Sequence, residues 1–301
     1  ELTKGLYVGT VEVTQELWSA VMGINPAAGE SYKGRSLDSP DYPVVYLSWC
    51  DAVVFANALS RHDGLTPSYQ LPAGFSASMS AAACDERSGD VVWDRSADGY
   101  RLLTESEWEY ACRAGTTTMY SWGNDINATR ANYSVSGLSQ TRDVGYYAAN
   151  PLGFFDMHGN VWEWTADWYQ AAYPTGNPVV DPTGPASGSD RVRRGGSWSH
   201  GEPHLRSARR YYDYSPSYRG SGVGFRVGFQ AVKPDGANPE LELFGGAGIT
   251  REAGQAWAEP GAAGHDARDG NLTASITITG TVDMNTTGTY VLTYSVADAA
   301  G

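Results

Sequence analysis

Lysine is nearly absent from this chain of 301 residues, which holds only Lys4, Lys33 and Lys233. The 21 basic residues are outnumbered by 34 acidic ones, and the formal net charge is −13. A protein that binds duplex nucleic acid needs a broad positive surface. The composition therefore argues against nucleic acid as a partner.

Cysteine and long apolar runs are also scarce. Cys50, Cys84 and Cys112 allow one disulfide at most, which is too few for a disulfide scaffold. No apolar run approaches the roughly 20 residues that a membrane span needs, so we expect no membrane span. Hydrophobic residues make up 41% of the chain and charged residues only 18%, a balance that allows a buried core and excludes a disordered acidic chain.

Three helices are predicted in the first part of the chain. Thr14 and Gly23 are suited to cap a short amphipathic helix over 15–22. Thr104 begins a capping box that leads into a helix ending near Gly115. The apolar spacing over 51–60 predicts the third helix.

Glycine, tyrosine and tryptophan are abundant, with 36, 19 and 10 copies. Residues 116–230 contain no long periodic segment, only short runs between Gly, Asn, Pro and Asp. Such a stretch is either disordered or a compact irregular fold held together by aromatic residues and a metal. The density of tryptophan favours the compact fold.

A change of composition divides the chain in two. Residues 232–239 are rich in Pro, Gly and Asn, which predicts a linker between a large domain, 1–232, and a small one, 239–301. The small domain has alternating runs at Ser275–Thr279 and Tyr290–Val296, a pattern typical of a small β-sandwich.

Six motifs of the large domain occur in an order that resembles the formylglycine-generating enzyme (sulfatase-modifying factor) family. They are Val11–Gln15, Pro43–Trp49, Tyr100–Tyr110, Gly153–Trp164, Arg194–Trp198 and Gly224–Arg226. The resemblance implies an α+β domain with an irregular C-type-lectin-like fold, made of few helices, small twisted sheets and much irregular chain. The small domain resembles the all-β immunoglobulin-like repeats of bacterial surface and secreted proteins. Its closing strand is missing, so we expect this chain to be part of a longer extracellular or cell-surface protein.

The resemblance implies copper chemistry that this sequence does not support. Family enzymes oxidise a substrate cysteine with a copper ion held by two cysteines, just after the Gly-Gly-Ser-aromatic motif. Soft thiolates select Cu(I), but residues 195–209 contain no cysteine, so we expect no copper. His200 and His204 are conceivable metal ligands. Gly201 and Pro203 disfavour a helix that would align them, so we interpret both as exposed loop residues.

Calcium is the metal that the resemblance still implies. The family's calcium ligands match Asp156, Gly159, Val161 and Glu163, and carboxylates with backbone carbonyls in a tight turn suit Ca²⁺. The alternative is a turn with solvated carboxylates. A second family site would use Asn132 and the carbonyl of Tyr133.

The segment between the last two motifs is rich in the residues of adaptable binding surfaces, Tyr, Ser, Gly, His and Asp. Its framework also resembles that of the variable proteins of diversity-generating retroelements. Arg194, Arg206 and Arg226 match framework positions and are expected in ion pairs, with Arg206, Ala208 and Phe225 buried. The predicted ligand-binding residues are Ser199, His200, Gly201, His204, Tyr211, Tyr212, Asp213, Tyr214, Ser217 and Tyr218.

These observations lead to one principal hypothesis and two alternatives. The principal one is a non-catalytic protein, diversified or not, whose loops over 199–221 bind an unknown protein or glycan ligand. The first alternative is a sulfatase-modifying enzyme or a related oxidoreductase of the same family. The second is a purely structural spacer.

Overall fold

The computed structural model describes residues 2–172, 179–230, 240–243, 261–266, 270–283 and 285–296. The chain divides into two compact units, residues 1–231 and 232–301. The predicted linker, 232–239, lies outside the described residues.

Two helices of the first unit begin and end as the sequence predicts. Helix α1 spans Gln15–Met22, and the side chain of its N-cap, Thr14, accepts a hydrogen bond from the Leu17 amide. Helix α4 spans Glu105–Arg113 and begins with the predicted capping box at Thr104. Local capping chemistry is therefore enough to set these helices.

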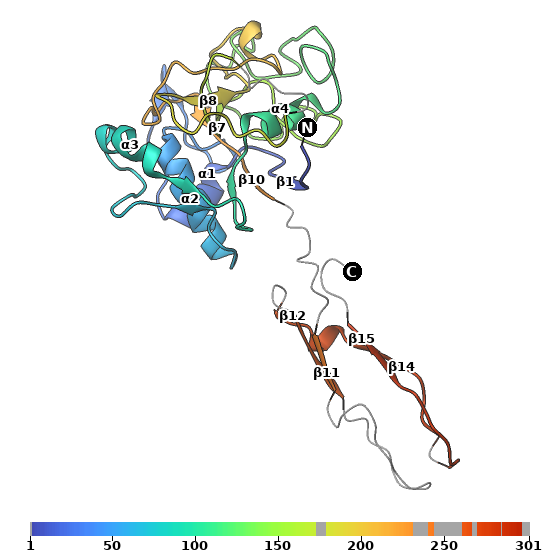
Figure 1. Ribbon diagram of the computed structural model, residues 1–301. Coiled ribbons are helices and arrows are strands. Elements are labelled where there is room, and N and C mark those ends of the chain that lie inside the picture. Colours follow the sequence, from blue (N-terminus) through green and yellow to red (C-terminus); the bar gives the residue numbers. More distant parts are fainter. Residues whose placement is uncertain are drawn as a thin grey trace. The chain divides into compact units, whose positions relative to one another are not determined.

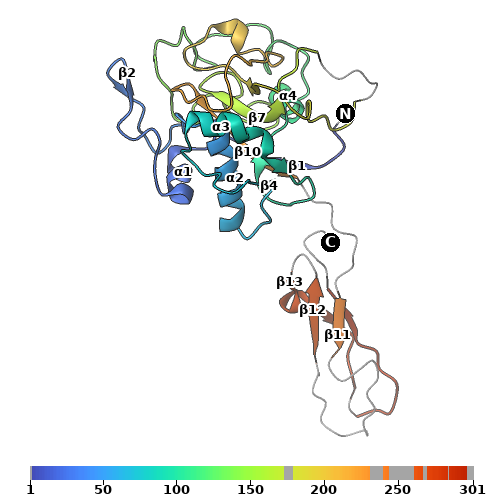
Figure 2. The ribbon, with the colours of Figure 1, turned by 60° about the vertical axis from the view of Figure 1, so that its left-hand side comes forward.

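The other two helices differ from the prediction or extend beyond it. Helix α2 spans Trp49–His62 and begins two residues early, because Ser48 and Asp51 form a capping box of their own. Helix α3, Ala81–Arg87, is not predicted by apolar spacing. A disulfide joins Cys50 to Cys84, so α3 is covalently tied to α2. Figure 2 shows α3 beside α2.

In the described residues of the first unit, short strands form four small sheets. A three-stranded antiparallel sheet has the order β1 (Leu6–Val8), β10 (Val227–Gln230), β6 (Arg101–Leu102). A second sheet has the order β8 (Arg191–Arg194), β7 (Trp162–Trp168), β9 (Val223–Gly224). The two hairpins are β2 (Ser31–Tyr32) with β3 (Arg35–Ser36), and β4 (Tyr69–Gln70) with β5 (Val92–Trp93).

Strand β7 organises the second sheet. It pairs antiparallel with β8 and parallel with β9. Residues 195–222, which we call the loop segment, leave from the end of β8 and return at the start of β9. Both ends of the loop segment are therefore fixed by the same central strand. Figure 1 shows the irregular chain on the side of β7 and β8 away from α1 and α2.

Aromatic rings form the core between the helices and the sheets. Trp18 of α1 stacks on Phe55 of α2 with ring centroids 5.0 Å apart, and Phe225 contacts both rings edge-on. Phe225 is fully buried, as predicted. Cys112 is buried as a free thiol.

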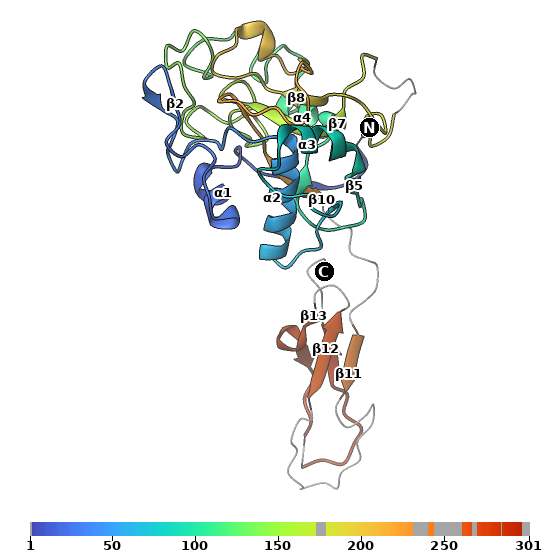
Figure 3. The same cartoon turned by 90° about the vertical axis from the view of Figure 1, so that its left-hand side faces the viewer.

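The described part of the second unit consists of short antiparallel strands and one 3₁₀ turn (Figure 3). The predicted runs at 275–279 and 290–296 contain β14 and β15, which pair with each other. The strands are β11 (Glu240–Leu243), β12 (Ala262–Asp266), β13 (Gly270–Asn271), β14 (Thr277–Thr279) and β15 (Thr293–Ser295), and the turn is Thr273–Ser275.

No helix in the described part of the chain has the length and apolar character needed to cross a membrane. The predicted α+β class, with few helices and small sheets, is confirmed.

Candidate functional site

Close packing fixes the course of the loop segment near its start. Gly196 has a φ of 81°, and a Cβ atom there would lie 2.8 Å from the side chain of Leu205. Leu205 is fully buried, and its carbonyl is 2.7 Å from Nδ1 of His158. The indole N–H of Trp198 donates to the carbonyl of Ser221 at 3.0 Å, which joins the two ends of the loop segment. The backbone beneath the predicted binding residues is therefore well supported.

Six rings converge on the loop segment, and we call them the aromatic cluster. Its base is Trp162 of β7, which is 1% exposed and stacks on Tyr211 with ring centroids 4.8 Å apart. Tyr211 lies 6.4 Å from Tyr214, which stacks on Tyr218 at 3.7 Å. The members are Trp162, His200, His204, Tyr211, Tyr214 and Tyr218, and every one except Trp162 is partly exposed.

The two histidines of the cluster meet edge-on, with ring centroids 5.1 Å apart. The sequence predicts two exposed loop residues; both do lie in the loop segment, but they are more buried than predicted. A 3₁₀ turn, Glu202–His204, folds the chain so that both rings become half-buried. Pro203 excludes a longer helix but fits the first positions of this turn.

His200 is neutral near pH 7, and the pKa of His204 is lowered as well. Burial, together with the nearby His204 and Arg193, lowers the pKa of His200 to about 4. Nδ1 of His200 is 3.2 Å from the indole nitrogen of Trp162 and 2.7 Å from Oγ of Ser197. Because an indole N–H can only donate, Nδ1 acts as the acceptor.

The histidine pair is not a metal centre in this geometry. Across the described residues, no three His, Cys, Asp or Glu side chains are grouped so that they could hold a metal ion. Burial lowers the pKa of His204, and the charges of Arg209 and Arg206 lower it further. A metal cation at this place would meet the same repulsion.

The remaining predicted binding residues lie around the aromatic cluster. Tyr212 is 42% exposed and stacks on Tyr169 with ring centroids 3.6 Å apart. Asp213 is exposed and interacts with the Tyr211 hydroxyl through a hydrogen bond. Ser199 is exposed, and Gly201 is half-buried at the start of the 3₁₀ turn.

Three positions correct the sequence prediction. Ser217 is only 9% exposed, so it anchors the loop segment and does not project from it. Arg206 and Ala208 are exposed where the family resemblance implies burial. Arg194 and Arg226 do form the expected ion pairs, with Glu109 and Glu163 respectively.

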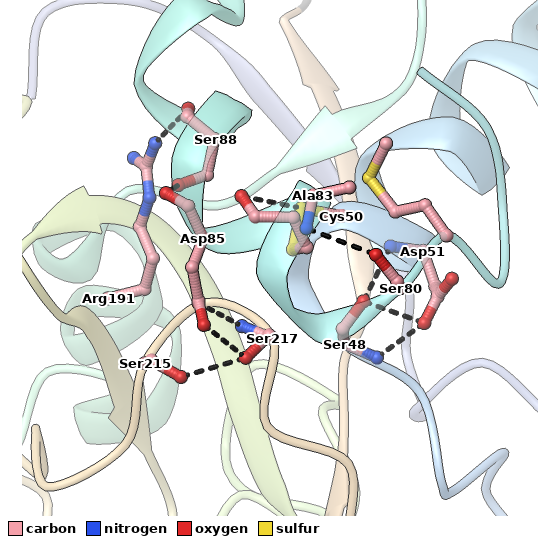
Figure 4. Close-up of a disulfide and its surroundings, with 12 residues drawn as sticks. Ser48, Cys50, Asp51, Ser80, Ala83, Asp85, Ser88, Arg191, Ser215 and Ser217 are labelled. Atoms are coloured by element: carbon pink, nitrogen blue, oxygen red, sulfur yellow. Dashed lines mark hydrogen bonds between the residues drawn. A yellow bond between two sulfur atoms is a disulfide. The ribbon is translucent and has the colours of Figure 1, made fainter. Parts of the chain in front are cut away.

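Ser217 is held by a carboxylate from α3. Its amide donates to Oδ1 of Asp85 at 3.2 Å, and its hydroxyl donates to Oδ2 at 2.8 Å. Figure 4 shows this contact, together with the hydroxyl of Ser215 that joins it.

A second carboxylate holds the same turn from α2. Asp51 accepts a hydrogen bond from Nε of Arg219 at 3.0 Å. Asp51 follows Cys50, and Asp85 follows Cys84, so the disulfide positions both acids. The covalent link between α2 and α3 thus supports residues 215–219.

The predicted calcium ligands lie in a tight turn and at the start of β7, and the one on β7, Glu163, is already paired. Glu163 is fully buried and receives Nε and Nη2 of Arg226 at 2.7 and 2.8 Å. The indole N–H of Trp108 donates to the same carboxylate at 2.8 Å. A calcium ion sharing this carboxylate would lie beside a guanidinium, so the pair with Arg226 competes with the predicted role of Glu163.

Asp156 fits a cation better. Burial raises its pKa to about 6, and Gly145 donates its amide to Oδ2. Burial and the charge of Asp156 raise the pKa of Glu12, and both Glu12 oxygens lack a hydrogen-bond partner among the described residues. A cation would neutralise this excess of buried negative charge.

Gly159 and Val161 are predicted to bind calcium through their backbone carbonyls, so the packing of their side-chain positions does not decide that role. Gly159 has a φ of 110°, and a Cβ there would lie 2.3 Å from the carbonyl of Asn132. Val161 is fully buried. The Asn132 amide donates to the Gln140 carbonyl at 2.9 Å and accepts from Ser136 at 2.8 Å, so its side chain is occupied. Calcium binding therefore stays a prediction, with Asp156 as its least committed carboxylate.

Sequence reasoning misses three residues of the candidate site: Trp162, Tyr169 and Arg193. Trp162 lies inside the motif Gly153–Trp164, but the motif does not predict a binding role for its side chain. Tyr169 follows β7 directly, and Arg193 lies on β8. Strand pairing brings them under the loop segment, a relation that is not visible in the linear sequence.

Residues 1–231 match the family described as "Sulfatase-modifying factor enzyme 1-like domain", and residues 241–301 match "Bacterial surface protein, Ig-like domain". The formylglycine-generating enzyme of Bos taurus is 28% identical over 226 residues, which cover 69% of this chain and 50% of that protein. The chain thus spans half the length of this relative. Chaperone protein LppX of Paenibacillus barcinonensis is 31% identical over 64% of this chain and 69% of its own length.

A solved structure is also similar to this chain. Variable protein 1 of Treponema denticola matches with a TM-score of 0.65 and 34% sequence identity, over 75% of this chain and 84% of that one. The resemblances inferred from the motifs are confirmed by these similarities.

Replacing Asp85 by Ala should loosen the loop segment without unfolding the domain. The amide and hydroxyl of Ser217 lose their acceptor, so we expect faster hydrogen exchange at residues 215–219 and a loss of about 1 kcal/mol in unfolding free energy. Glu86→Ala, one residue along α3 and also exposed, is the matched control. Equal exchange in both variants would show that Asp85 does not support the turn.

Removing calcium should lower the melting temperature if Asp156 holds the ion. Binding to the native state alone adds about 2.7 kcal/mol of stability at a ligand concentration 100 times Kd. We expect a chelator to lower the melting temperature of the wild-type chain and to leave that of Asp156→Asn unchanged. Identical calorimetric curves with and without chelator would rule out this calcium site.

Proposed function

We propose that this chain, which belongs to the sulfatase-modifying factor enzyme 1-like domain family, is a non-catalytic protein that binds a ligand with its loop segment. The observation that carries the proposal is the aromatic cluster, five of whose six rings are partly exposed on a segment fixed at both ends by β7. Tyrosine supplies large and rigid contact area at little entropic cost, and buried tyrosines dominate many interfaces.

The support beneath the rings fits recognition. Binding residues are commonly carried by loops on a rigid scaffold. Here Leu205 packs against Gly196, and Asp85 and Asp51 hold the far part of the loop segment. A preorganised surface loses less conformational entropy on binding than a mobile one.

The cysteines oppose the copper chemistry of the family. Cys50 and Cys84 are joined in the disulfide, and burial raises the pKa of Cys112 to about 12. Thiolates, not thiols, bind metal and react. Together with the absence of cysteine from residues 195–209, this leaves no thiolate pair for Cu(I).

The alternative is an enzyme of the formylglycine-generating class. Its support is the 28% identity to the bovine formylglycine-generating enzyme. Domains of one fold commonly carry different functions, so similarity over the framework does not transfer chemistry whose ligands are missing.

We also propose an extracellular or cell-surface location for the protein. Disulfides persist mainly in oxidising compartments, and Cys50–Cys84 is buried between two helices. The match of residues 241–301 to an Ig-like family of bacterial surface proteins agrees with this location. The ligand would then be a protein or glycan outside the cell.

Replacing Tyr212 by Ala should weaken ligand binding and leave folding intact. The ring is exposed, so stability should change by about 0.5 kcal/mol or less, while a contact of this kind contributes roughly 1–3 kcal/mol to binding. Arrays of proteins and glycans would first identify a binder, and affinities would then be measured by calorimetry. We expect a loss of about tenfold or more.

Tyr7→Ala is the matched control for Tyr212→Ala. Tyr7 is also exposed and also stacks on another ring, Phe229, but it lies on the β1–β10–β6 sheet. Equal affinities of the Tyr212 and Tyr7 variants would place binding elsewhere on the domain.

The enzymatic alternative has its own test. Incubation with copper and a cysteine-containing sulfatase peptide should give no aldehyde by mass spectrometry, because no thiolate pair is present. The bovine relative serves as the positive control. Peptide aldehyde formed at a catalytic rate would replace our proposal by the enzymatic one.

A further inference from the structure

Arg193 is a buried cation without a polar partner. Its side chain is 0% exposed, and none of its three guanidinium nitrogens has a hydrogen-bond partner in the described part of the chain. The other arginines buried there all donate hydrogen bonds to carboxylates or carbonyls. They are Arg101, Arg191, Arg194 and Arg226.

Aromatic faces surround this cation. The guanidinium carbon lies 4.2 Å from the ring centroid of Tyr214, 5.1 Å from that of Trp164 and 5.3 Å from that of Tyr211. Burial lowers the pKa of Arg193 to about 10, so it is charged at neutral pH. Ring faces attract a cation but do not replace its hydrogen bonds, and an uncompensated buried charge is costly.

Two more arginines without an ion pair in the described structure lie near the aromatic cluster, where both lower the pKa of His204. Arg209 stacks on Tyr211, with its guanidinium carbon 5.6 Å from the ring centroid. Arg206 is exposed and donates only to the Pro203 carbonyl, at 3.1 Å. Within the described residues neither forms an ion pair, whereas the neighbouring Arg210 pairs with Glu105.

The net charge of the chain makes this group of three arginines unusual. The protein carries −13 overall, yet three cations gather around Tyr211 and His204 with no acid within ion-pair distance in the described structure. Asp213 lies at the Tyr211 hydroxyl and is the acid whose charge acts on Arg193, while the tyrosines around it are neutral. The aromatic cluster therefore has a positive character.

We propose that the partner of the loop segment is a protein that inserts an acidic side chain, Asp or Glu, beside Tyr211. This inference rests on the proposed binding function and specifies its ligand. The carboxylate contacts Arg206 and Arg209 directly, and Arg193 attracts it from beneath the tyrosine rings. An interaction of this kind is strong because the rings exclude water from it.

The arrangement fits an acidic protein segment better than a sulfated polysaccharide. Three cations in one place suit one or two carboxylates, whereas an extended polyanion needs a row of cations. The partly exposed tyrosine and histidine rings around them provide the apolar contact that protein interfaces use, with Arg and Tyr as dominant contributors.

The test selects random peptides displayed on phage with the immobilised full chain. We expect the selected peptides to be enriched in Asp and Glu. Replacing these acids by Asn or Gln in a selected peptide should reduce its affinity at least ~10-fold, and added salt should weaken the wild-type complex.

Variants of the protein test whether the three arginines cause the affinity for acidic peptides. Arg206→Gln and Arg209→Gln should each lower the affinity of the selected acidic peptide several-fold, because each removes a contacting cation. Arg95→Gln is the matched control, since Arg95 is also exposed and stacks on a ring, Trp93, at 5.4 Å. Arg193→Met should lower affinity with an unchanged or raised melting temperature, because it removes a buried unpaired charge.

The outcomes separate this inference from the proposed function. Selected peptides without acidic enrichment, whose binding is lost in Tyr212→Ala, would leave the binding function standing and overturn the acidic partner. Displacement of the acidic peptide by a sulfated polysaccharide of higher affinity would also overturn it. A fall in the melting temperature of Arg193→Met with full peptide affinity would make Arg193 a purely structural residue.

Discussion

The buried pair between Arg226 and Glu163 is the interaction on which the first unit depends. Both side chains are fully enclosed, and the guanidinium also donates to the carbonyls of Gly9 and Phe155. It thereby joins the N-terminal segment, the turn before β7, β7 itself and the chain between β9 and β10. Removing one partner of such a pair leaves an uncompensated charge and costs about 3–5 kcal/mol. A fold with short strands and much irregular chain needs such a central polar link, because it has few backbone hydrogen bonds between strands.

From this link the support continues outward to the loop segment in two steps. The pair fixes β7, and β7 pairs with the strands on which the loop segment begins and ends. The disulfide then places Asp51 and Asp85 against residues 215–219. The exposed rings consequently rest on backbone that is already ordered. Sequence change at the rings can alter recognition without altering the frame, since the frame is held by residues elsewhere.

The parts of the fold that follow from local chemistry were predictable from sequence, and those that follow from distant contacts were not. The caps at Thr14 and Thr104 determine α1 and α4, because a cap acts within one turn. Helix α3 has no apolar spacing and is tied to α2 by the disulfide, so the sequence pattern does not predict it. In the candidate site, residue type identifies the tyrosines as binding residues. It cannot place Ser217, whose burial depends on an acid 132 positions away.

Arg193 shows the same limit for charge. The net charge of −13 determines how the whole protein repels anions at a distance, and for that reason the sequence argues against nucleic acid as a partner. Local charge depends on which arginines find acids, and the fold gives acids to Arg194, Arg210, Arg219 and Arg226 but none to Arg193, among the residues described. In the proposed complex the net charge of the protein and the local charge of the arginines act together. Long-range repulsion disfavours acidic partners in general, so a partner gains affinity only when its carboxylate reaches the arginines and its surface covers the rings. Selectivity then arises from a requirement for both contacts at once.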